Sequence, residues 1–208
     1  MSKPGRSFSS KKRNRQNRKE KPMIIITAEG RNETEAKYFD GFRTPDCPYI
    51  IKFHKAGHLT DPTKLAESIR KRWDAEEADV RTGDMAFVVV DLDNKESKAK
   101  EIQQLEAKNR VEKFIVSNPS FEVWYLLHYE YSTRSYMNAD AVIRELKKHF
   151  SGYEKTSDMY PLLKKKMNEA IANAEKLEAY HKEEVHQHPD VSRNPYTDMH
   201  KLVKKLIG

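Results

Sequence analysis

The segment IIITAEGRNETEAKYF, from Ile24 to Phe39, decides the fold class of this chain. A buried strand is expected from Met23 to Ala28, because strand-forming residues fill it, and a helix is expected from Asn32 to Phe42. Glu29 and Gly30 lie between the two. An acid at this place meets ligands in open α/β sheets, which bind them at the carboxyl ends of their strands. The alternative is that Glu29 is a turn residue before a glycine.

The alternation of strand and helix continues through the first half of the chain. Further strands are expected from Tyr49 to His54, from Met85 towards Asp93 and from Glu112 to Ser117. Helices are expected between them, one beginning at Asp61-Pro62 and a charged one from about Glu96 to Asn109. This order predicts an α/β fold with a mainly parallel sheet of about four strands, flanked by helices on both faces.

After the fourth strand the pattern becomes purely helical. In NPSFEVWYLLHYE, Asn118 and Pro119 are expected as the N-cap and first residue of a helix that carries Glu122 one turn inside. Glu122 lies in a segment that is apolar almost all round, and a buried carboxylate needs a partner or a metal. Three further helices are expected, near residues 139–150, 158–180 and 195–207. The chain is therefore divided into an α/β core, residues 23–130, and a helical C-terminal extension, residues 131–208.

Composition excludes several classes of protein. The 208 residues include no apolar run of membrane-spanning length, and the N-terminal segment lacks the apolar stretch of a signal peptide. Cys47 is the single cysteine, which excludes an internal disulfide framework and multi-cysteine zinc sites. His181, His186 and His188 are irregularly spaced in a polar segment, which argues against a zinc site built from them. We expect a soluble cytoplasmic protein with no membrane partner.

The positive charge is concentrated in residues 1–22. This arm holds nine Lys and Arg residues and one acid, whereas the whole chain has a net charge of +7, so the rest is nearly neutral. With almost no apolar residues the arm is expected to be disordered. It suits a polyanion such as RNA or DNA, and a solubilising tail is the alternative. The candidate phosphate-binding residues are Lys11, Lys12, Arg13, Arg15, Arg18 and Lys19.

Two acids close the most hydrophobic strand of the chain, in MAFVVVDLDN. In an extended chain Asp91 and Asp93 point to the same side, because side chains at i and i+2 share a face. Two carboxylates held this close favour a cation between them, and Mg²⁺ takes oxygen ligands of this kind. Strands one and three of a parallel sheet end at the same edge, so Glu29 is expected to converge with the pair. The sequence predicts a site for Mg²⁺, with Mn²⁺ as a substitute.

Four motifs in order now carry a family resemblance: IIITAEGRNETEAKYF, FVVVDLDN, SNPSFEVWYLLHY and NPYTDMHKLVKKL. They resemble the RloB family, proteins associated with restriction loci and abortive phage infection, over roughly Pro22 to Leu206. That family is similar to the Toprim fold of topoisomerases, primases and overcoming-lysogenization-defect nucleases. There, a glutamate after the first strand and a later DxD bind Mg²⁺ for phosphoryl transfer.

The resemblance implies roles for individual residues. Glu29 would be the Toprim glutamate, and Asp91 and Asp93 the metal acids. Asn118 and Glu122 would belong to the family's Asn-Pro-x-Phe-Glu motif. Gly30 and Asn118 are candidate substrate-binding residues. Glu35 stays open between a site residue and a capping-box partner of Asn32, because the spacing after Gly30 departs from the family pattern by one residue.

Three functions from different classes are compatible with these residues. The first is a metal-dependent nuclease acting on RNA or DNA, as the effector of an antiphage system; Glu29 would complete the metal shell or act as general base, and Glu122 is a candidate for a second metal. The second is a nucleic-acid-binding or adaptor module without turnover. The third is a phosphohydrolase or phosphotransferase of small nucleotides, but the chain lacks a GxxxxGK[ST] phosphate loop. The resemblance implies a neighbouring ATPase as a partner.

Overall fold

The computed structural model describes residues 21–30, 33–182 and 188–208. The predicted disorder of the arm, the six candidate phosphate-binding residues in it and the predicted cap Asn32 lie outside this part of the chain. Lys21 and Pro22, which the sequence assigned to the arm, belong to the fold. Lys21 donates hydrogen bonds to the main-chain oxygens of Pro45 and Cys47, and the carbonyl of Pro22 accepts one from the Ile50 amide.

A five-stranded, mostly parallel sheet forms the centre of the molecule, in the order β2-β1-β3-β4-β5. The strands are β1 (Met23–Ala28), β2 (Ile50–His54), β3 (Met85–Asp91), β4 (Glu112–Asn118) and β5 (Tyr196–Thr197). The first four are parallel and β5 is antiparallel to β4. The predicted α/β fold and its four parallel strands are therefore confirmed, and the fifth strand is new.

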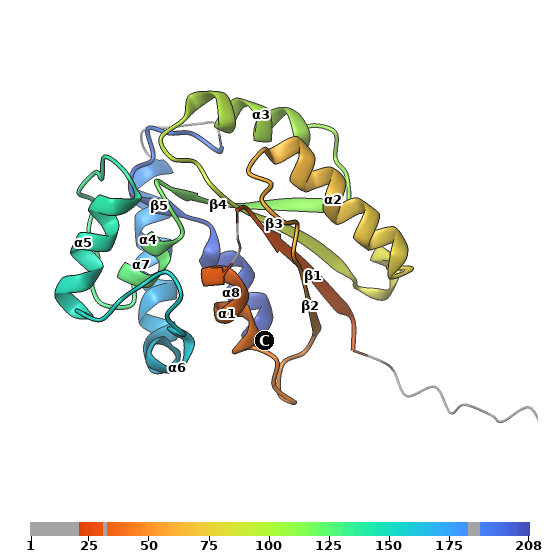
Figure 1. The fold of residues 1–208 in the computed structure, drawn as a ribbon, viewed down its shortest axis with the longest axis horizontal. Coiled ribbons are helices and arrows are strands. Elements are labelled where there is room, and N and C mark those ends of the chain that lie inside the picture. Colours follow the sequence, from red (N-terminus) through yellow and green to blue (C-terminus); the bar gives the residue numbers. More distant parts are fainter. Residues whose placement is uncertain (1–20, 31–32, 183–187) are drawn as a thin grey trace, which may run out of the picture.

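Helices cover both faces of this sheet (Figure 1). The α2/α3 face is covered by α2 (Pro62–Ala75) and α3 (Glu96–Glu106), and the short helix η1 (Val80–Thr82) precedes β3. The opposite face, here called the α1/α4 face, is covered by α1 (Glu33–Asp40), α4 (Glu122–Leu126) and the C-terminal helices. Those helices are α5 (Ala139–His149), α6 (Tyr160–Leu163), η2 (Lys164–Lys166), α7 (Met167–Lys182) and α8 (Met199–Ile207).

Side-chain alternation along the strands builds a separate apolar core on each face. In β3, Val88 and Val90 pack in the core of the α2/α3 face, whereas Phe87 and Val89 pack in the core of the α1/α4 face. This alternation is the ordinary consequence of strand geometry. It also determines which face receives the residue that ends the strand.

The start of α2 agrees with the sequence. Asp61 is the N-cap, its carboxylate accepts a hydrogen bond from the Lys64 amide at 2.9 Å, and Pro62 lies in the first turn. Proline fits there because its missing N–H has no helical partner. Among the described residues no helix has both the length and the apolar character needed to cross a membrane.

The predicted helical extension over residues 131–208 needs correction. The expected helix 158–180 is divided into α6, η2 and α7, and the expected helix 195–207 begins only at Met199, because Tyr196 and Thr197 form β5. Leu177 and Leu202 share one apolar core with Ile24 and other side chains of the sheet. The C-terminal part thus completes the α1/α4 face instead of forming a purely helical appendage.

Asn118 is also placed differently from the prediction. It is the last residue of β4, paired with Tyr196 of β5, and α4 begins at Glu122. The sequence gives no local signal for this extension, because the pairing strand lies almost 80 residues further along the chain.

Candidate metal and phosphate site at the carboxyl edge of the sheet

The carboxyl ends of the neighbouring strands β1 and β3 bring the predicted acids together. Ala28, the last residue of β1, pairs with Val89 of β3, so Glu29 and Asp91 emerge beside each other at one edge. This edge is where open α/β sheets bind their ligands. Five carboxylates from four parts of the chain interact here: Glu29, Glu35, Asp91, Asp93 and Glu122.

Asp91 lies on the α1/α4 face of the sheet. Phe87 and Val89 point to that face, and Asp91 continues the alternation. Its pKa is raised well above the usual range, first by burial and then by repulsion from the other acids, Glu29 and Glu122 foremost. A buried carboxyl group with such neighbours favours either a proton or a bound cation.

Asp93 does not share an extended strand with Asp91, so the predicted geometry of the pair is wrong. The strand ends at Asp91, and Asp93 lies in the left-handed region with φ of 52°. The turn forms because Leu92 is buried on the α2/α3 face and its carbonyl accepts a hydrogen bond from the Lys95 amide at 2.8 Å. The Asp93 side chain, 37% exposed, instead reaches the acidic edge through Lys98.

Lys98 is the site residue that the sequence analysis missed. Its side chain is only 9% exposed, and its ammonium group donates to Glu29 Oε2 at 2.6 Å and Asp93 Oδ2 at 3.4 Å. It also donates to the main-chain oxygen of Asp91. Burial raises the pKa of Glu29 despite the opposing attraction of Lys98. The available signal was spacing, since Lys98, Ile102 and Leu105 form one buried stripe of α3.

Glu35 lies with the acids. Its side chain is buried, and its pKa is raised to about 7, first by burial and then by repulsion from Glu122 and Glu29. The capping-box alternative depends on Asn32, which is outside the described residues. The location of Glu35 favours a site residue.

Glu122 is buried and faces the same edge. Its carboxylate accepts hydrogen bonds from Ser120 Oγ at 2.7 Å and Tyr153 OH at 3.1 Å, and it repels both Asp91 and Glu35. Both hydrogen-bond partners are neutral hydroxyl groups. Glu122 therefore contributes negative charge to the carboxyl edge, as its placement there required.

Three asparagines hold the turn that carries Asp93. Asn118 Oδ1 accepts from the Asn94 amide at 3.1 Å, and Asn194 Nδ2 donates to Asn94 Oδ1 at 2.8 Å. Asn194 also exchanges hydrogen bonds with the main chain of Tyr136. The Asn118 amide group donates to the carbonyls of Val191 and Arg193. The side chain of Asn118, a candidate substrate-binding residue, is thus engaged in holding loops together.

Gly30 closes the turn after β1. Its φ of 65° lies in the region that favours glycine, and its amide donates to the Leu59 carbonyl at 2.7 Å. The amide that a substrate phosphate would use is therefore occupied in this conformation. The role of Gly30 that the geometry explains is the turn that presents Glu29.

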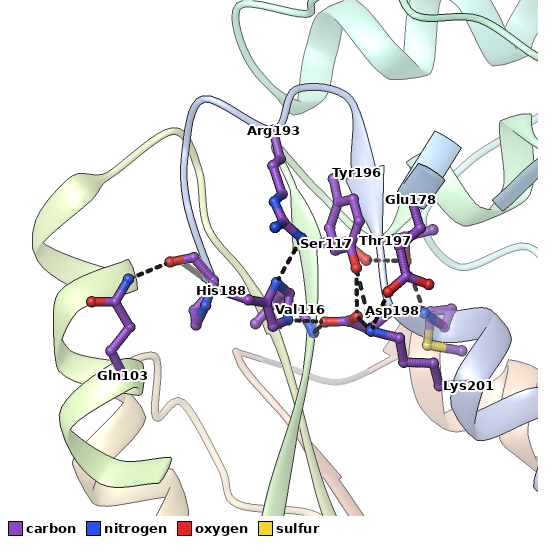
Figure 2. Close-up of polar contacts among 12 residues, drawn as sticks. Gln103, Val116, Ser117, Glu178, His188, Arg193, Tyr196, Thr197, Asp198 and Lys201 are labelled. Atoms are coloured by element: carbon purple, nitrogen blue, oxygen red, sulfur yellow. Dashed lines mark hydrogen bonds and ion pairs between the residues drawn. The ribbon is translucent and has the colours of Figure 1, made fainter. Parts of the chain in front are cut away.

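A second polar network anchors the C-terminal motif to β4 (Figure 2). The buried carboxylate of Asp198 accepts hydrogen bonds from His188 and Tyr196, both at 2.8 Å, and from Lys201 at 2.6 Å. Burial alone would raise the pKa of Asp198, but His188 and Lys201 outweigh it and hold the pKa well below its usual range. His188 is thus paired with a carboxylate, and His181 with the Pro195 carbonyl. His186 lies outside the described residues.

The acidic edge fits a hard divalent cation by its chemistry. No group of three or more His, Cys, Asp or Glu side chains in the described ranges is arranged as a complete metal cage. Mg²⁺ does not need one, because proteins commonly hold it through one or two carboxylates, with waters and substrate phosphates completing the shell. Asp91, Asp93 and Glu29 are the residues that would hold it.

Comparison with known proteins places most of the chain in one group. A family model described as RloB-like protein matches residues 24–206. No curated protein and no solved structure is significantly similar to the chain. The likeness to the Toprim fold therefore stays a prediction.

Proposed function

This chain belongs to the RloB-like protein family, and we propose that it is a metal-dependent nuclease that hydrolyses phosphodiester bonds of RNA or DNA. The observation that carries the proposal is the gathering of five carboxylates at the carboxyl edge of β1 and β3, where they interact and raise one another's pKa. Lys98 and the exposed Lys95 neutralise only part of this charge. The surplus charge favours binding of a divalent cation, and the edge is open to a ligand.

The acids divide into ligands and a candidate base. Asp91, Asp93 and Glu29 would hold Mg²⁺ or Mn²⁺, which supplies neutralising charge for the scissile phosphate. Glu35 has a pKa of about 7 and is therefore partly ionised at neutral pH, which suits a group that accepts a proton from the attacking water. Glu122, held by Ser120 and Tyr153, maintains the negative potential beneath the site and is the candidate for a second metal.

The family resemblance extends the proposal to a biological setting. A glutamate after the first strand and acids after the third strand match the order that the Toprim resemblance implies, and we include a Toprim-like mechanism in the proposal. The same resemblance leads us to propose an antiphage, abortive-infection role with an ATPase as a partner protein. Residues 1–20, with their Lys and Arg side chains, would add affinity for nucleic acid.

The proposed activity is tested by incubating the purified protein with labelled RNA and DNA. Cleavage is expected with Mg²⁺ or Mn²⁺, and it should stop when a chelator is added. Asp91→Asn should be inactive, whereas Asp74→Asn, which changes an exposed acid on α2, should cleave like the wild type. Cleavage that survives in chelator, or in Asp91→Asn, would contradict a metal-dependent site at this edge.

A second candidate function follows from Lys98. Its ammonium already neutralises Glu29 at 2.6 Å, which also fits a nucleic-acid-binding or adaptor module without turnover. This alternative predicts binding of RNA or DNA with unchanged affinity in chelator and no cleavage with any divalent metal. The same incubations, followed by a filter-binding assay, distinguish the two functions.

A further inference from the structure

Lys98 occupies the place of a cation at the acidic edge. Its ammonium group contacts oxygens of Glu29, Asp91 and Asp93, two of them carboxylate and one main-chain. Oxygens of these kinds are the ligands that a hard divalent metal takes. The side chain is 9% exposed, so the charge is held within the edge and not in solvent.

The neighbouring Lys95 provides an internal comparison. Its ammonium lies 3.3 Å from Asp93 Oδ2, about as close as that of Lys98, but its side chain is 64% exposed. An exposed pair is screened by water and contributes little. A buried ammonium interacts much more strongly with the same carboxylate, because water does not screen it. The two lysines thus differ in what they do to a cation that approaches the acids.

We propose that Lys98 is a built-in competitor for the metal, whose ammonium and a divalent cation occupy the oxygens of Glu29 and Asp93 in turn. The inference rests on the proposed metal site and adds a residue that sets its affinity. Without metal, Lys98 neutralises the edge and keeps its carboxylates in place. Metal binding requires the ammonium to leave, so the protein binds metal more weakly than its carboxylates alone would allow.

Metal affinity in two lysine variants tests the competition. Lys98→Met removes the charge and keeps a long apolar side chain, and Lys95→Met is the matched control. Titration calorimetry with Mn²⁺ should give tighter binding to Lys98→Met, by about tenfold or more, the size of effect typical of groups that contact metal ligands. Lys95→Met should bind like the wild type. Equal or weaker binding to a folded Lys98→Met would overturn the proposal.

A measurement on the wild-type protein covers the case in which Lys98→Met does not fold. Trace acetylation followed by peptide mass spectrometry reports how accessible each lysine amine is. Labelling of Lys98 relative to Lys95 should rise at least about threefold when Mg²⁺ is added, because the displaced amine is released from its carboxylates. Unchanged labelling at a metal concentration that saturates the protein would overturn the proposal.

The outcomes separate this inference from the proposed function. Competition without cleavage of RNA or DNA supports the role of Lys98 and contradicts the nuclease. Metal-dependent cleavage with equal metal affinity in wild type and Lys98→Met supports the nuclease and contradicts the competition. If neither protein binds metal, both proposals fail.

Discussion

Glu35→Gln is expected to change how the stability of the protein depends on pH. In the folded protein, burial and the neighbouring Glu122 and Glu29 raise the pKa of Glu35 from 4.5 to about 7. Between these two values the folded state binds a proton that the unfolded state has released. The wild type therefore loses stability as the pH rises through this interval, whereas a glutamine at this position has no proton to lose.

The size of the effect follows from the shift. One pKa unit corresponds to about 1.4 kcal/mol, so the free energy of unfolding of Glu35→Gln relative to wild type should rise by about 2–3 kcal/mol from pH 5 to pH 8. The change with pH is the informative quantity, because any constant cost of burying the glutamine amide cancels. Relief of the repulsion on Asp91 acts in the same direction.

Urea unfolding in metal-free buffer at several pH values measures this difference. Glu33→Gln is the matched control, because Glu33 lies on the same helix with an exposed side chain. Its stability relative to wild type should stay constant with pH. A flat difference for Glu35→Gln as well would mean that Glu35 is not held among the carboxylates, and it would remove the candidate base.

Three further predictions concern other parts of the structure. Asp91→Asn should keep or raise the metal-free melting temperature while it abolishes metal binding, since it relieves repulsion; a large loss of stability would make Asp91 structural. Asn194→Ala removes hydrogen bonds to Asn94 and Tyr136 and should lower the free energy of unfolding by about 1–3 kcal/mol and weaken Mn²⁺ binding, whereas unchanged metal binding would separate the asparagine cluster from the site. Deletion of residues 1–20 should flatten the salt dependence of nucleic-acid binding by about 0.7–0.9 per lost phosphate contact and leave turnover at saturating substrate unchanged; binding with the same salt slope would exclude the arm from recognition.

The sequence predicted the elements whose signal is local. The apolar runs of β1 and β3, and the Asp61-Pro62 start of α2, are each encoded within a few residues and appear as expected. The convergence of Glu29 and Asp91 followed from the rule that parallel strands end at one edge.

The features that the sequence did not predict depend on distant contacts. The two-residue strand β5 exists only because Asn118 and Ser117 pair with it from the far end of the core. The turn at Asp93 is held by the asparagine cluster around Asn94, whose members are far apart in the chain. Lys98 looked like one charge among many on a polar helix, and only the position of α3 over the strand ends gives it the acids as partners.

The location of a bound metal tests the central claim most directly. Crystals soaked in Mn²⁺ should give an anomalous-difference peak at the carboxyl edge of β1 and β3, in contact with Asp91 and with Glu29 or Asp93, and the peak should be lost in Asp91→Asn. The same data should show the Lys98 ammonium moved away from Glu29. A protein that takes up Mn²⁺ only at other places, with Lys98 still bound to Glu29, would contradict a metal site built from these acids.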